Sequence, residues 1–115
     1  MPTERFIRKK AIEKLQANGW ITWFPAKARF KQNDIFGIID LLAVKGKIMK
    51  KIQLTTLPNV SERRKKIISF LKKYKVELPV EIWGWSKKDK SFRKEKINIK
   101  LRKKHLKSNR AVENL

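Results

Sequence analysis

The chain has 115 residues, a length that argues for one domain. Lysine and arginine together number 31, and aspartate and glutamate 10, so the formal net charge is +21. A surface this cationic is tolerated mainly when a polyanion neutralises it. We therefore expect nucleic acid as the partner and no association with membranes. The domain is expected at residues 1–100, followed by a basic tail at residues 101–115.

The residue types present exclude several kinds of chemistry. The chain contains no cysteine, so it can form no disulfide, thiolate zinc site or cysteine nucleophile. Its one histidine, His105, lies in the lysine-rich tail, which argues against a histidine metal cage or a Ser-His-Asp triad. No apolar run approaches the roughly 20 residues that span a bilayer, and the N-terminus lacks the apolar core of a signal peptide. We expect a cytoplasmic protein, in the host cytoplasm if the source is viral.

The first half of the chain predicts a helix followed by strands. Residues 3–18 carry apolar side chains at helical spacing after Thr3, which can cap the helix. Residues 20–24 are rich in aromatic and β-branched side chains and predict a strand. A basic connector covers residues 26–34. Two apolar runs, at residues 35–44 and 48–55, flank a short link containing glycine and predict a hairpin.

The second half predicts a helix over residues 61–74, beginning at a cap supplied by Asn59 or Ser61. Two strands follow, at residues 80–86 and 91–99, around a lysine-rich turn. Trp83 and Trp85 alternate on the first of these strands and point to one side, where core packing is favoured over stacking on a base. The order α-β-β-β-α-β-β predicts an α/β fold, a mixed central sheet flanked by helices.

Two polar residues interrupt the most apolar part of the chain. Asp40 lies between Ile39 and Leu41, and Gln53 lies between two apolar neighbours on the partner strand. Burying a carboxylate costs several kcal/mol unless a partner compensates for it. Period-2 geometry places Lys51, Gln53 and Thr55 on one face, and hairpin pairing brings that face beside Asp40. Oxygen ligands of this kind suit Mg²⁺ or Mn²⁺. The alternative is structural: Asp40 answers a local amine and Gln53 caps a backbone group.

At these residues the sequence resembles the PD-(D/E)XK nuclease superfamily, particularly the small archaeal Holliday junction resolvase type and related viral nucleases. The match covers roughly residues 4–86. The resemblance makes Glu4 the acidic residue of the first helix, Asp40 the strand aspartate, and residues 53–55 a Gln-x-Thr in place of Glu-x-Lys. It implies a restriction-endonuclease-like core, a magnesium or manganese cofactor held by Asp40 and Gln53, and hydrolysis of DNA phosphodiester bonds.

Two positions depart from the family pattern. Gln53 replaces glutamate, a change the superfamily accommodates because the amide oxygen can still bind a cation. Thr55 replaces the lysine that offsets charge in the transition state, and Lys51 is the candidate migrated lysine, with Lys50 a weaker one. Asp34 is either a further metal ligand or a turn residue. Resolvases of this type act as dimers, so the resemblance implies a homodimer as one arrangement, with no interface fixed by the sequence.

Three function classes follow. The first is a metal-dependent endonuclease, selective for branched or nicked DNA in one version. The second is a nucleic-acid-binding protein on the same fold that has lost catalysis, which Thr55 favours. The third is a basic RNA- or ribosome-associated module. In each class the phosphate contacts are expected from basic side chains that give affinity without sequence choice: Lys27, Arg29, Lys31, Arg63, Arg64, Lys65 and Lys66.

Overall fold

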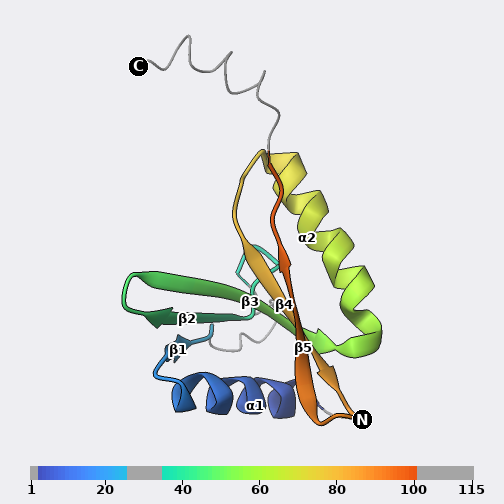
Figure 1. The fold of residues 1–115 in the computed structure, drawn as a ribbon. Coiled ribbons are helices and arrows are strands. Elements are labelled where there is room, and N and C mark those ends of the chain that lie inside the picture. The colour runs from blue at the N-terminus through green and yellow to red at the C-terminus, as the bar shows by residue number, and fades with distance from the viewer. Residues whose placement is uncertain (1–2, 26–34, 101–115) are drawn as a thin grey trace.

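The computed structural model describes residues 3–25 and 35–100, and Figure 1 shows their arrangement. Two helices lie on a five-stranded mixed sheet whose strand order is β1-β2-β3-β4-β5. The elements in chain order are α1 (Glu4–Ala17), β1 (Ile21–Trp23), β2 (Leu41–Lys45), β3 (Ile48–Thr56), the short 3₁₀ helix η1 (Leu57–Asn59), α2 (Val60–Tyr74), β4 (Val80–Ser86) and β5 (Ser91–Ile97). The predicted α/β class and the predicted order of helices and strands are confirmed.

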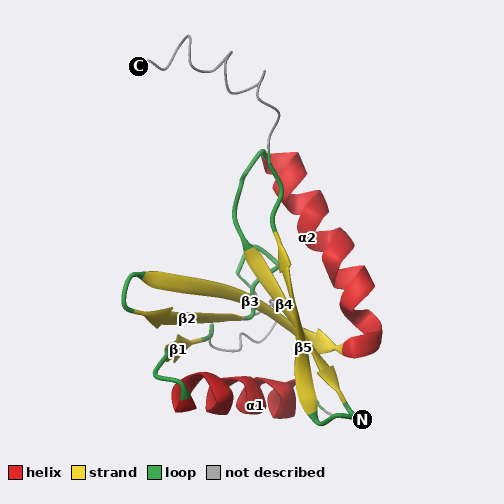
Figure 2. Cartoon of the chain, in the orientation of Figure 1, coloured by secondary structure: helices red, strands yellow, loops and turns green. Residues whose placement is uncertain are grey.

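Strand pairing follows the lengths of the connections. Short turns join β2 to β3 and β4 to β5, and these pairs are antiparallel, as is β1 with β2. Strands β3 and β4 are parallel, and α2 forms the crossover between them. Figure 2 shows α1 and α2 on different sides of the sheet. Within residues 3–25 and 35–100, no helix is long and apolar enough to cross a membrane.

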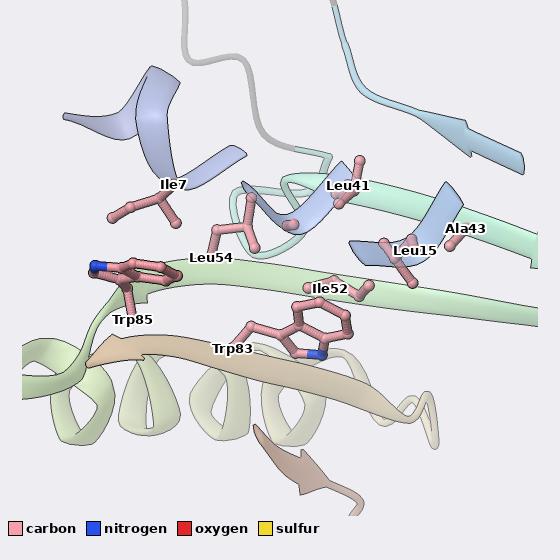
Figure 3. Close-up of a cluster of buried hydrophobic side chains, with 9 residues drawn as sticks. Ile7, Leu15, Leu41, Ala43, Ile52, Leu54, Trp83 and Trp85 are labelled. Atoms are coloured by element: carbon pink, nitrogen blue, oxygen red, sulfur yellow. The ribbon is translucent and has the colours of Figure 1, made fainter. Parts of the chain in front are cut away.

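Helix α1 begins where the sequence predicts. The Thr3 side chain accepts a hydrogen bond from the Phe6 backbone N–H at 3.0 Å, and this caps the first turn. Three residues at helical spacing, Ile7, Ala11 and Leu15, form its buried stripe. They pack on β2, β3 and β4 in the cluster of Figure 3, where Trp83 and Trp85 lie among aliphatic side chains. The core interpretation of these two tryptophans is confirmed.

Helix α2 covers the other face of the sheet. Its residues Ile67 and Leu71 are fully buried and pack against Val80 and Ile82 of β4. The helix begins at Val60, and neither cap predicted for it forms as expected, because Asn59 occupies the cap position without a side-chain bond to the helix. Instead the Asn59 amide donates to Thr56 Oγ1.

The predicted strand over residues 35–44 is wrong in its first half, since β2 begins only at Leu41. Phe36 and Gly37 have positive φ values of 57° and 75°, so the backbone turns where extended structure was expected. The turn is closed by backbone hydrogen bonds between Ile35 and Ile39 in both directions, at 2.7 and 3.0 Å. The apolar side chains of this segment predicted a strand, but they belong to a turn that packs into the core, where Ile38 and Ile39 are buried.

Candidate functional site

Asp40 lies at the point where the β2–β3 ladder ends. The Asp40 backbone N–H donates to the Ile52 carbonyl at 2.8 Å, and the Asp40 carboxylate Oδ2 accepts the Leu54 backbone N–H at 2.8 Å. The side chain therefore continues the ladder by one bond after the strand backbone has turned away. This is a structural role, and it fixes the carboxylate against β3.

Gln53 is the second partner of this carboxylate. Its amide Nε2 donates to Asp40 Oδ2 at 2.5 Å, so the predicted juxtaposition of the two residues is confirmed. Gln53 is only 2% exposed. Among the described residues, its amide oxygen Oε1 is buried without a hydrogen-bond partner. A buried oxygen without a hydrogen-bond partner costs free energy.

A small cavity lies between the first helix and Asp40. Glu4 and Arg8 of α1 line it, together with Asp40 and Leu54. Its volume is about 10 Å³, close to the room that one water molecule occupies. Glu4 and Asp40, which the resemblance assigns to one site, therefore lie beside the same cavity. Both are hard oxygen donors of the type that Mg²⁺ prefers. Gln53 does not line this cavity, because it pairs with Ile82 on the face of α2, whereas Leu54 lies on the face of α1.

Arg8 is a site residue that sequence reasoning missed. It lies one helical turn after Glu4, and its guanidinium carbon is 4.4 Å from the centroid of the Phe24 ring. Phe24 lines the same cavity, so Arg8 is held there by a cation–π contact. The i,i+4 spacing of Glu4 and Arg8 on a predicted helix was the signal that would have found it.

The lysine candidates on β3 lie in different surroundings. Lys50 forms an ion pair with Glu81 at 2.8 Å on the face of α1, so its charge is already matched. Lys51 is half-buried and lies on the same face of β3 as Gln53 and Thr55, as predicted. Thr55 is buried and lies opposite Gly84 in the register of β3 with β4, and it supplies no cation.

Some predicted residues lie outside the described part of the chain: Asp34, Lys27, Arg29, Lys31 and the tail with His105. Among the described residues, no group of three or more carboxylate, histidine or cysteine side chains is placed to hold a metal. The donor set at the small cavity therefore consists of two carboxylates, those of Glu4 and Asp40. It is a sparser set than the three acidic positions of the family pattern.

The basic residues predicted on α2 divide into two kinds. Lys65 and Lys66 are exposed. Arg64 donates to both carboxylate oxygens of Glu95 on β5, from Nε at 2.5 Å and from Nη2 at 2.8 Å. The hydrogen bonds from Arg64 lower the pKa of Glu95. Arg63 is half-buried. Lys65 and Lys66 are therefore the better phosphate-binding candidates of this segment.

Comparison of the chain with protein family models, with curated protein sequences and with solved structures finds no match.

Proposed function

We propose that the protein is a metal-dependent endonuclease that hydrolyses DNA phosphodiester bonds, with its centre at the cavity between the N-terminal end of α1 and the start of β2. The observation that carries the proposal is the convergence of Glu4 and Asp40 on one small cavity, with Arg8 beside them. A charge of +21 supports a polyanionic substrate. The α-β-β-β-α-β-β order and the mixed sheet with a helix on each face agree with what the resemblance to PD-(D/E)XK nucleases implies.

The oxygen donors suit one divalent cation, magnesium or manganese. Asp40 and Glu4 would hold it, and Gln53, whose amide N–H donates to Asp40 Oδ2, would position the Asp40 carboxylate. When bound, such a cation polarises a phosphate and lowers the pKa of water. Asp40 is fixed for this role by two N–H donors, so no side-chain reorganisation is required of it.

The missing lysine at position 55 needs a replacement. Arg8 borders the cavity and is permanently charged, so it can offset negative charge that develops on the phosphate. It joins Lys51 as a candidate for that role. Arg8 has the advantage of lining the cavity together with both acidic residues.

The experiment is a cleavage assay on labelled single-stranded, duplex and four-way-junction DNA with magnesium, with manganese or with chelator. Asp40→Asn and Glu4→Gln each remove one carboxylate, and each is expected to slow metal-dependent cleavage by about 100-fold or more. The matched control is Glu62→Gln, which occupies the first turn of α2 as Glu4 does that of α1. It removes the same charge outside the cavity and is expected to leave the rate unchanged.

Cleavage that persists in chelator, or an Asp40→Asn protein that cuts at the parental rate, contradicts the proposal. A second candidate, a nucleic-acid-binding protein that has lost catalysis on the same fold, is favoured by Thr55 and by the sparse donor set. It predicts tight binding with no cutting in either metal by the parent chain. The assay with the parent chain therefore separates the two candidates.

A further inference from the structure

A second and larger cavity lies on the other side of α1 from Glu4 and Arg8. It is a groove of about 730 Å³ between α1 and the β4–β5 hairpin, a volume in the range of ligand-binding clefts. Its apolar lining is aromatic: Phe6, Trp85 and Phe92. Trp85 contacts Phe6 edge-on at 5.5 Å between ring centroids and Phe92 at 5.0 Å. Trp85 is nearly buried, whereas Phe6 is 39% exposed. Phe6 is therefore the most exposed of the three rings, and Trp85 packs against it.

Lysine side chains border these rings. Lys10 and Lys14 contribute from α1, and Lys87 and Lys90 from the turn of the hairpin. The lining contains one carboxylate, Glu13, whose oxygen is 3.9 Å from Lys10 Nζ. Since the cations outnumber this carboxylate, the groove attracts an anion. The Lys10 ammonium also lies 5.6 Å from the centroid of the Phe6 ring.

The strand beside the groove also places a lysine against an aromatic ring. Lys94 of β5 lies over the Trp83 ring, 4.4 Å from its centroid. Burial lowers the pKa of Lys94, and the positive charge of Lys14 lowers it further. The ammonium groups of Lys14 and Lys94 thus repel each other in the free protein. A phosphate placed near Lys14 relieves this repulsion.

We propose that this groove is a binding site for an unpaired segment of DNA, with one base stacked on Phe6 and the adjoining phosphates held by Lys10, Lys14, Lys87 and Lys90. Stacking on an exposed ring requires a base that is free of its own stack, so single-stranded DNA is favoured over duplex. The proposal deepens the proposed function and rests on it for the choice of DNA. It would give a nuclease a preference for substrates with unpaired nucleotides.

The combination of an exposed aromatic ring with lysines favours single-stranded DNA over other anionic ligands. An acidic peptide satisfies the lysines but offers no flat π-surface for Phe6 in each repeating unit. A DNA strand offers one base and one phosphate per nucleotide, which matches an aromatic floor with a lysine border.

The test measures binding in the presence of chelator, by fluorescence anisotropy of a labelled oligodeoxythymidylate and of a duplex of equal length. Phe6→Ala is expected to weaken binding of the single strand by about 5- to 100-fold and to change duplex binding less. Phe6→Trp is expected to retain it. The matched control is Phe36→Ala, which removes an exposed ring that packs against Phe70 of α2. A Phe6→Ala protein that is folded by circular dichroism and binds the single strand with unchanged affinity overturns the proposal.

The phosphate contacts are tested separately by salt dependence. Lys14→Gln with Lys87→Gln is expected to reduce the slope of log K against log salt by about 0.7 for each phosphate that the variant no longer neutralises. The control is Lys72→Gln with Lys73→Gln, which makes the same charge change on exposed residues of α2. Equal slopes in the two double variants contradict the assignment.

Photocrosslinking of an oligonucleotide that contains 5-iodouracil locates the base. The expected crosslinks are on the lining of the groove, at Phe6 foremost. Crosslinks confined to Phe36 and Tyr74, or competition by polyglutamate that removes the oligonucleotide as well as unlabelled single strand does, overturn the proposal. Because these experiments use chelator, failure of the nuclease assay leaves them interpretable, and failure here leaves the cleavage assay on Asp40 interpretable.

Discussion

The two faces of the sheet are covered to different extents. Under α2, the fully buried side chains Ile67 and Leu71 seal an apolar layer against β4. Under α1, the helix covers only part of the sheet and leaves the groove along the β4–β5 hairpin and the small cavity beside Asp40. The face of α1 also carries the ion pair of Lys50 with Glu81, and Glu81 accepts a hydrogen bond from the Trp83 indole at 2.9 Å.

This difference separates two tasks in a chain of one domain. A closed apolar face supplies stability because it removes apolar surface from water. An incompletely covered face leaves charged and aromatic side chains accessible, which binding to a polyanion requires. Changes to the buried side chains under α2 should therefore act on folding, and changes to the exposed or charged side chains on the α1 face should act on binding or on pH dependence.

The largest effect on stability is expected from Leu71→Ala. This change leaves a cavity in the layer between α2 and β4 and should lower the free energy of unfolding by about 3 kcal/mol. Urea denaturation measures it. Under conditions where the variant remains folded, its affinity for single-stranded DNA in chelator should equal that of the parent, in contrast to Phe6→Ala. A loss of affinity in folded Leu71→Ala protein would show that the two faces are not independent.

Gly84→Ala tests how closely the crossover helix approaches the sheet. A Cβ atom at this position would lie 2.6 Å from Val60 Cγ2 and 3.4 Å from Leu57 Cα, so the start of α2 would have to shift. We expect a loss of about 1 to 3 kcal/mol from this overpacking. Gly46→Asn is the control, because Gly46 has a positive φ that asparagine tolerates and no neighbouring atom within 4 Å. Similar unfolding curves for the two variants would refute the close approach.

The smallest effect is expected from Glu81→Gln on the face of α1. Burial opposes ionisation of Glu81, but hydrogen bonds from Lys50 and Trp83 outweigh it and lower its pKa below the usual 4.5. A lowered pKa stabilises the folded state above pH 4.5, and this contribution is lost as the pH falls through the pKa of the folded protein. Removing the carboxylate should cost about 1 kcal/mol at neutral pH.

The measurement for Glu81 is the free energy of unfolding as a function of pH. The difference between the parent and Glu81→Gln should shrink toward low pH. A difference that is independent of pH would mean that the carboxylate of Glu81 is not the stabilising group.

The sequence predicted the contact between Asp40 and Gln53 because a buried polar side chain without a partner costs free energy wherever it lies in the chain. A carboxylate at Asp40 and an amide at Gln53, each among apolar neighbours, have to find partners, and the structure joins them to each other. Arg8 was missed because a basic residue in a chain with 31 of them carries little information by itself. The ion pair of Arg64 with Glu95 was missed for a related reason, since only the crossover of α2 brings that residue to β5.

By itself, the sequence determined the order of helices and strands, since apolar periodicity, turn residues and the Thr3 cap act over a few residues and need no distant partner. It also determined the charge and hence the class of partner that we propose. Only the tertiary structure decided where the apolar segment before Leu41 stops being a strand, because a turn and a strand can bury the same side chains. Tertiary structure likewise decided that α1 borders two cavities, since both are formed between elements far apart in the chain.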